Sequence, residues 1–141
     1  MTAEFVIHTA PEGKARPRVT SHGTYTPQRT RDFENFVRWE YRTQCRHNFG
    51  TAPICVIIVA YFPIPASTSK RKADAMLRLD VWPTKKPDAD NIAKAVCDAL
   101  NGYAYQDDAQ IVSLSVAKRY AREPKIDVTI TDYLEECHAG D

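Results

Sequence analysis

Apolar and polar positions alternate with different periods along the chain, and these periods predict its strands. Nine consecutive apolar or aromatic residues, 54–62, are rich in β-branched side chains and are followed by prolines, which predicts a strand buried on both faces. Residues 110–120 and 125–132 have apolar side chains at every second position, the period of a half-buried strand. In residues 110–120 the predicted buried face includes Val112 and Leu114.

Periods of three and four residues predict helices between these strands. One helix starts near Thr30 and is closed by Gly50, with aromatic residues on one side and arginines on the other. A short helix follows Ser67 or Ser69, either of which can cap it, and runs to about Leu77. These two helices flank the apolar strand on either side in the sequence.

A third predicted helix is acidic. Pro87 disfavours helical geometry for the residue before it, so the helix begins at Asp88 or Asp90, either of which can cap it. Gly102 suits the position just past its end. At about 100° per residue, its apolar side chains fall on one side and its charged side chains on the other, so the helix is amphipathic.

The order of these elements predicts the fold class. A short strand at residues 5–9 comes first, and a segment rich in Pro, Gly, Ser and Thr, residues 14–27, predicts a loop or hairpin. Residues 135–141 are expected to form a frayed tail. With 141 residues in the order β-α-β-α-α-β-β, we expect a single α/β (α+β) domain over residues 1–141, with a mixed β-sheet packed by helices.

Composition narrows the class of protein. Apolar residues make up 43% of the chain and charged residues 26%, as in soluble globular domains. No apolar run approaches the roughly eighteen residues that span a bilayer, and the N-terminus lacks a signal-peptide pattern. Four scattered cysteines without a C-x-x-C pair (Cys45, Cys55, Cys97 and Cys137) argue against a zinc site and for reduced thiols. We therefore expect a cytoplasmic protein that binds no membrane.

The charge of the chain is unevenly distributed. The net charge is +1, but residues 14–46 carry eight Lys or Arg against three acids, or +5, which leaves −4 elsewhere. Three cations also open the second predicted helix, where they oppose the helix dipole; an anionic partner explains them better than solvent does. For the arginines of the first helix, a solvated face is the simpler interpretation. The residues predicted to contact a polyanion are Lys14, Arg16, Arg18, Lys70, Arg71, Lys72, Lys85 and Lys86.

The acids of the third helix have two interpretations. Asp90, Lys94 and Asp98 follow one another at four-residue spacings, as in an ordinary surface ladder of ion pairs, and Asp107-Asp108 could mark a turn. Alternatively, the carboxylates form a metal site. Asp88 lies two residues before Asp90, at an irregular helix start where both side chains can converge on one point.

The donor types select the metal. Carboxylates without His or Cys are hard oxygen ligands suited to Mg²⁺, or to Mn²⁺, rather than zinc. An EF-hand is excluded because, counting from Asp88, Ala93 stands where Gly is required and Ala99 where Glu is required. No phosphate-binding glycine motif is present, so we expect no nucleotide cofactor. Carboxylates, a nearby lysine and separate basic segments together suit hydrolysis of phosphodiesters.

These residues also resemble a known family. The run KPDADNIAKAVCDALNG followed by YQDDAQIVSLSVAKRY resembles the signature of the RusA family of Holliday junction resolvases, which are small metal-dependent endodeoxyribonucleases often encoded by phages and prophages. The likeness extends over residues 14–130 and includes KARPRVT and YTP. By position, the resemblance implies metal-binding carboxylates at Asp88, Asp90 and Asp108 and a catalytic lysine at Lys94. It implies supporting roles for Asn91, Asp98 and Asp107.

The resemblance sets the functional expectation. It implies a RusA-like fold and a Mg²⁺-dependent endonuclease, with Mn²⁺ as an alternative, that acts as a homodimer on branched DNA in recombination and repair. Metal-activated water would hydrolyse the phosphodiester, the lysine would stabilise developing charge, and the basic segments would hold phosphates. Two alternatives stay open: a nuclease for flaps or forks, and a catalytically weak junction-binding module.

Overall fold

The computed structural model describes residues 1–14, 18–25 and 27–132, and for Arg18 and Tyr25 it describes the backbone alone. Its main sheet has four strands, in the spatial order β1-β6-β4-β5. Strand β4 pairs with β5 in parallel and with β6 antiparallel, and β1 pairs antiparallel with β6. The predicted mixed sheet is therefore confirmed. The strands are β1 (Thr2–Ile7), β4 (Ile54–Pro63), β5 (Ile111–Ala121) and β6 (Lys125–Thr131).

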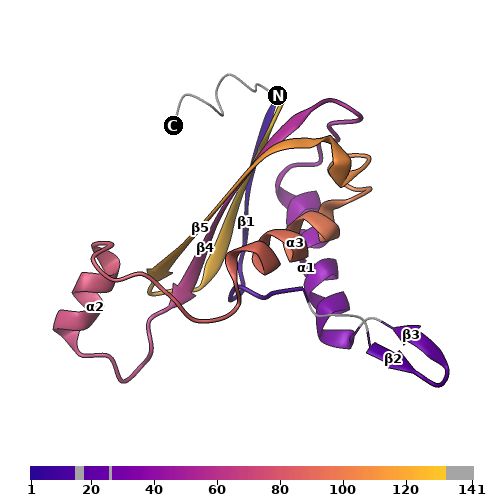
Figure 1. Ribbon diagram of the computed structural model, residues 1–141. Coiled ribbons are helices and arrows are strands. Elements are labelled where there is room, and N and C mark those ends of the chain that lie inside the picture. The colour runs from indigo at the N-terminus through magenta and orange to yellow at the C-terminus, as the bar shows by residue number, and fades with distance from the viewer. Residues whose placement is uncertain (15–17, 26, 133–141) are drawn as a thin grey trace.

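Two helices cover one face of this sheet (Figure 1). They are α1 (Gln28–Gln44) and α3 (Ala89–Leu100), and they also pack against each other. Alternate residues of β4, β6 and β1 point toward the helices, and their side chains form one core with the apolar faces of α1 and α3. The single domain thus consists of a helical layer on a mixed sheet, an α+β arrangement.

Smaller elements extend from the two-layer body (Figure 1). The segment predicted as a loop or hairpin forms a hairpin of β2 (Arg18–Thr20) and β3 (Gly23–Tyr25). The short helix α2 (Lys70–Leu77) contacts β5, and Ser69 caps it by accepting a hydrogen bond from the backbone N–H of Lys72 at 3.3 Å. Of the two serines predicted as caps, Ser69 is therefore the one used.

The predicted apolar face of β5 (Val112, Leu114 and Val116) is buried only in part, because Val116 packs against the core and the other two residues are exposed. Val112 is 59% exposed and Leu114 is 49% exposed, although their two-residue period predicted burial. Strand β5 is an edge strand, and these two side chains stay half exposed even though α3 contacts β5 and Leu114 lines a cavity between them. The alternation of apolar and polar residues predicted the strand correctly, but it did not predict which of the apolar side chains are buried.

The start of the first strand, the end of the first helix and the state of one cysteine also differ from the prediction. The first strand starts earlier than predicted, at Thr2, because its edge pairs along its whole length with β6. Helix α1 ends at Gln44, and Gly50 instead provides a turn with positive φ (61°) before β4. Cys45 and Cys97 are free thiols, as expected, but Cys55 is disulfide-bonded, contrary to the expectation of reduced thiols.

Candidate active site

The start of helix α3 presents a carboxylate that the helix does not use. Asp88 is the N-cap residue of α3, with φ −67° and ψ 153°, yet its side chain makes no capping hydrogen bond. A capping Asp ordinarily accepts a bond from a free backbone N–H of the first turn. The Asp88 carboxylate is exposed and remains available for another partner.

The predicted ladder of ion pairs along α3 does not form. Asp90 and Lys94 are exposed, and no ion pair within 4.0 Å joins Lys94 to Asp90 or Asp98 in the described part of the chain. Asp98 instead pairs with Lys14 of the loop after β1, at 3.4 Å. The simple interpretation of this polar face as a surface ladder is therefore wrong, and Asp90 and Lys94 keep their charges uncompensated by each other.

A buried tyrosine stabilises the turn that connects the end of α3 to the second acidic segment, Asp107-Asp108. Tyr105 is fully buried, and its hydroxyl donates a 2.6 Å hydrogen bond to the carbonyl oxygen of Cys97. The backbone N–H of Gly102 donates to the Tyr105 carbonyl oxygen at 2.9 Å, which closes a compact turn. Burial raises the pKa of the Tyr105 hydroxyl well above its usual range, so it remains a donor. The turn therefore brings Asp107 and Asp108 back beside α3.

Gln110 fixes the position of these two acids. The backbone N–H of Asp107 donates to Gln110 Oε1 at 2.9 Å, and Gln110 Nε2 donates to the carbonyl oxygens of Gly50 and Ala52, both at 2.8 Å. A single 3₁₀ turn, Asp108–Gln110, then leads into β5. The glutamine thus holds the acidic turn against the turn that precedes β4.

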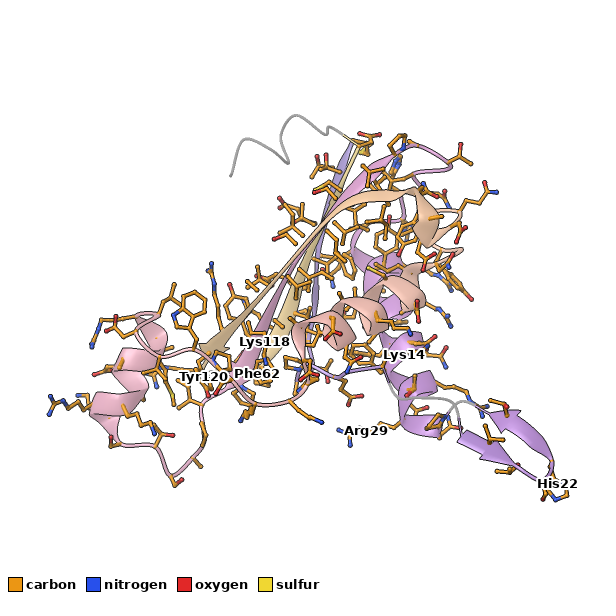
Figure 2. All side chains as sticks on the ribbon, viewed as in Figure 1. Lys14, His22, Arg29, Phe62, Lys118 and Tyr120 are labelled. Atoms are coloured by element: carbon orange, nitrogen blue, oxygen red, sulfur yellow. The ribbon has the colours of Figure 1, made fainter. Side chains whose placement is uncertain are left out.

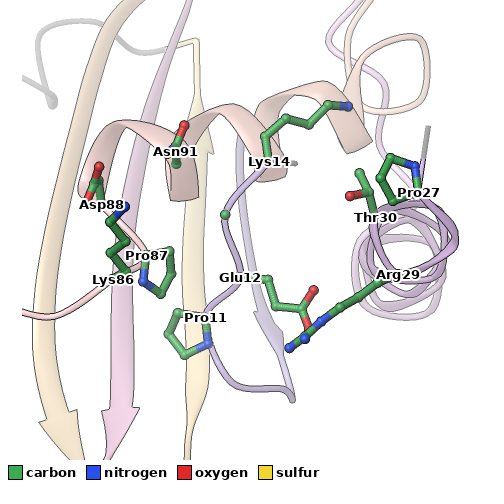
Figure 3. A pocket seen from close by; sticks show the side chains of 11 residues that line it. Pro11, Glu12, Lys14, Pro27, Arg29, Thr30, Lys86, Pro87, Asp88 and Asn91 are labelled. Carbon is green, nitrogen blue, oxygen red and sulfur yellow. The ribbon is translucent and has the colours of Figure 1, made fainter. Parts of the chain in front are cut away.

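Two neighbouring cavities divide the predicted site residues. A cavity of about 380 Å³ lies between α3 and the start of β5; its lining includes Asp90, Lys94, Asp98 and Asp108. A second cavity, of about 630 Å³, includes Asp88 and Asn91 with Lys14 and Lys86 (Figure 3). Asp88 and Asp90 thus line neighbouring cavities, whereas Asp90 and Asp108, from separate elements, line the same one.

Negative charge is concentrated around Asp108. Its hydrogen bond with the Asp107 side chain is the first cause that raises the pKa of Asp108, followed by desolvation and the charges of Asp107 and Asp98. The neighbouring Cys97 is buried, and burial raises the pKa of its thiol to about 11, so it stays protonated at neutral pH. The carboxylates, and not the thiol, therefore supply the charge of this cavity.

Lys14, predicted to bind a polyanion, instead lies within the protein. Its ammonium is 2.7 Å from Glu34 of α1 and 3.4 Å from Asp98 of α3, and its side chain is 19% exposed. Burial by itself would lower the pKa of Lys14, but the hydrogen bonds and charges of Glu34 and Asp98 outweigh it, and the pKa is raised. This lysine therefore links two helices through a part-buried pair of carboxylates.

The other predicted cations lie in three places. Lys70, Arg71 and Lys72 are exposed on the first turn of α2, and Lys85 and Lys86 are exposed in the linker before α3. Arg16 lies outside the described residues, and for Arg18 only the backbone is described. Lys85 and Lys86 therefore lie just before α3 in the chain, whereas the three cations of α2 lie on a separate helix that contacts β5.

Lys118 of β5 holds the linker that carries two of these cations. Its ammonium donates a 2.6 Å hydrogen bond to the carbonyl oxygen of Lys85 and lies 5.0 Å from the ring centroid of Phe62. Figure 2 shows Lys118 and Phe62 together at the end of the sheet from which the linker leaves toward α3. This contact sets the direction in which the chain approaches Asp88.

The donor set is compatible with a divalent cation, although the described residues contain no group of three Asp, Glu, His or Cys side chains close enough to hold one. Asp90 and Asp98 are separated by two turns of helix, about 12 Å, so one ion cannot be bound by both at Mg–O distances near 2.1 Å. Asp88 and Asp90 are the closer pair along the chain, and Asp108 approaches from the next element. Oxygen donors of this kind suit Mg²⁺ or Mn²⁺.

Known proteins resemble this chain over most of its length. Residues 8–131 match the family described as Endodeoxyribonuclease RusA. The chain belongs to the RusA endodeoxyribonuclease family. It is also 32% identical over 135 residues to "Uncharacterized protein YqaN" of Bacillus subtilis (strain 168), which covers 92% of this chain and 95% of that protein.

Membership of the RusA family implies that the protein is an endodeoxyribonuclease, that is, a hydrolase of DNA. The RusA family acts on branched DNA. The matched residues include the acidic helix, the 3₁₀ turn and both long strands of the parallel pair. Among the described residues, no helix is both long enough and apolar enough to cross a membrane.

Two supporting residues were missed by sequence reasoning. Gln110 belongs to the D-D-x-Q pattern, but its double hydrogen bond to the turn before β4 depends on a distant segment. No role was predicted for Gly13. A Cβ atom at this position would lie 3.1 Å from Pro87 Cβ and 3.2 Å from Asn91 Cβ. The missing side chain lets the loop after β1 lie directly against the first turn of α3.

Proposed function

We propose that this protein is a Mg²⁺-dependent endonuclease that resolves four-way DNA junctions by paired hydrolysis of phosphodiesters. The observation that carries the proposal is that Asp90, Lys94 and Asp108, from two separate elements, line one cavity while the Asp88 carboxylate beside it makes no capping bond. Family membership supports the reaction class, and the exposed cations of α2 and the linker suit a phosphate backbone.

In this proposal each residue has a stated role. Asp88, Asp90 and Asp108, all of them exposed, would hold the metal ion. When bound, Mg²⁺ lowers the pKa of coordinated water and neutralises charge on the phosphate oxygens. The ammonium of Lys94 would stabilise the charge that develops on the phosphate or on the leaving oxygen. Asp98, Asp107 and Asn91 would support these groups from α3 and the acidic turn.

The proposed active form is a homodimer. A four-way junction has approximate two-fold symmetry, and productive resolution needs matched cuts in two strands of like polarity. The acidic cavity between α3 and β5 would make one cut, so two copies related by a two-fold axis would meet the requirement. The exposed apolar side chains of the edge strand β5, Val112 and Leu114, and Trp39 on α1, which is 58% exposed, are the candidate contacts.

A panel of labelled DNA substrates tests the proposal. Four-way junctions, flaps, forks and linear duplex would be incubated with the protein in Mg²⁺, in Mn²⁺ and in EDTA, with Asp90→Asn as the inactive control. We expect paired, symmetric cuts in the four-way junction only when a metal ion is present. Cleavage confined to flaps or forks would replace the junction with those substrates, and binding without cleavage in either metal would show a junction-binding module.

A further inference from the structure

The β2–β3 hairpin projects away from the two-layer body. Figure 2 shows His22 at its tip, far from the sheet and from α2. The tip is held by its own contacts: the Thr20 hydroxyl accepts a 3.2 Å hydrogen bond from the His22 backbone N–H and lies 3.0 Å from the Gly23 carbonyl oxygen. Gly23 has a φ of 116°, which suits glycine at this turn. The turn is therefore built without support from the core.

The residues on either side of this hairpin, Lys14 and Arg29, make contacts at the candidate active site. The backbone N–H of Lys14 donates to the Asn91 carbonyl oxygen at 3.2 Å, and its ammonium pairs with Asp98. On the other side of the hairpin, Arg29 pairs with Glu12 at 3.2 Å across the cavity that includes Asp88 (Figure 3). The described residues on both sides of the hairpin thus line the cavity that includes Asp88, or pair with Asp98 of α3.

The composition of the segment indicates its partner. Between Lys14 and Arg29, the segment 15–28 contains two cations, Arg16 and Arg18, and no Asp or Glu, which favours a polyanion. Val19 is 81% exposed, and an isolated two-stranded hairpin is only marginally stable in water. A partner that binds it would therefore offer negative charge together with a groove into which a narrow ribbon fits. The major groove of B-DNA, about 12 Å wide, admits a two-stranded ribbon.

We propose that the β2–β3 hairpin is a groove-binding arm, whose turn at residues 20–23 enters the major groove of one duplex arm of the DNA substrate. Lys14 and Arg29, which flank the hairpin, line the cavity that includes Asp88, so the contacted duplex would lie near the acids of α3. The hairpin would bind the duplex next to the branch point, and it would take no part in the hydrolysis. This inference rests on the proposed function, because it assigns the surface that holds the substrate.

Site-specific photocrosslinking tests the arm. A p-benzoylphenylalanine is placed at His22 or, as a matched control, at Glu4, which is exposed on the sheet face opposite the helices. Each full-length variant is irradiated with a labelled four-way junction in EDTA, so that no cutting occurs. We expect the variant at position 22 to crosslink to a duplex arm several-fold more than the variant at position 4.

A second measurement identifies the groove. Dimethyl sulfate methylates guanine N7, which lies in the major groove, so bound protein should protect guanines in the contacted arm. The double variant Val19→Thr, His22→Gln should lose this protection and bind the junction roughly fivefold more weakly, as expected for loss of about 1 kcal/mol of contacts. Because both substitutions leave the Lys and Arg residues in place, the salt dependence should not change.

The outcomes separate the arm from the proposed function. If the wild-type protein binds the junction but position 22 crosslinks no more than position 4, or crosslinks to a second protein chain, the arm is wrong while the proposed function stands. Protection of the minor groove alone would also overturn it. If the wild-type protein binds and cuts no DNA at all, the proposed function fails and the arm fails with it.

Discussion

The ammonium of Lys14 lies 2.7 Å from the carboxylate of Glu34, and this pair joins the loop after β1 to helix α1. A third group, the carboxylate of Asp98, lies 3.4 Å from the same ammonium and extends the contact to α3. Because these side chains are mostly buried, removing one charge leaves the others without compensation. The network therefore contributes to the position of the acidic helix as well as to stability.

Replacing Lys14 tests this structural role. Lys14→Met keeps most of the apolar stem and removes the charge, so we expect the free energy of unfolding to fall by about 1–3 kcal/mol. Urea unfolding measures it, with Lys70→Met on the exposed turn of α2 as the control that should change little. Unchanged stability combined with weaker DNA binding would instead show that Lys14 contacts phosphate.

The stability of the Lys14 variant also has a pH signature. The folded-state pKa of Lys14 is raised, so its stabilising contribution is fully present below the unfolded-state value and is lost as the pH rises through the folded-state value. The difference in unfolding free energy between wild type and Lys14→Met should therefore shrink only in the alkaline range, above about pH 10. A difference that already disappears near neutral pH would contradict the ion-pair assignment.

Neutralising the carboxylates proposed as ligands should separate cleavage from binding. Asp88→Asn, Asp90→Asn and Asp108→Asn should each abolish cleavage in Mg²⁺, because a ligand charge is lost, while junction binding is retained because no repulsion is added. Asp80→Asn, an exposed position next to Arg78, is the control that should cut normally. Near-normal cleavage by any one of the three would remove that residue from the ligand set.

The hydroxyl of Tyr105 should be worth about 1–2 kcal/mol of stability. Tyr105→Phe removes the buried hydrogen bond to the Cys97 carbonyl oxygen and leaves that oxygen without this donor. The matched control is Tyr103→Phe, because the Tyr103 ring is 45% exposed. Thermal unfolding of both variants is the measurement, and equal midpoints would show that the Tyr105 hydrogen bond does not hold the acidic turn in place.

The exposed cations of α2 should dominate the salt dependence. Changing Lys70, Arg71 and Lys72 to Gln removes up to three phosphate contacts, so the slope of log K against log salt should flatten by up to about 2.7. Fluorescence anisotropy across a salt series measures the slope, and Lys14→Met should leave it nearly unchanged. An unaltered slope in the triple variant would place α2 away from the DNA.

The protein should be a homodimer at micromolar concentration. Burial of Val112 and Leu114 against a second copy would remove apolar area from water, so Val112→Ser with Leu114→Ser should shift the equilibrium toward monomer, whereas Trp39→Ser should not. Sedimentation velocity distinguishes the two species. If Trp39→Ser dissociates the dimer instead, the interface lies on α1; a monomer that still makes paired cuts would defeat the dimer argument.

The sequence by itself determined the local elements and the reaction class. The apolar run of β4 and the two-residue period of β6 predicted strands, since side-chain alternation is a property of the strand backbone. Pro87 and Gly102 bounded α3 because proline and glycine restrict or permit particular backbone angles. The acidic pattern, with its spacing, indicated the RusA family, which the comparison confirmed.

Only the tertiary structure decided which charges meet. Lys14 was expected to face a polyanion, but Glu34 and Asp98, at 20 and 84 positions further along the chain, enclose its ammonium when α1 packs beside α3. Leu114 was expected to be buried, yet the sheet order leaves β5 at an edge, where Leu114 stays 49% exposed beside α3. Periodicity is a property of one element, whereas burial and ion pairing depend on which elements become neighbours, and segments distant in sequence decide that.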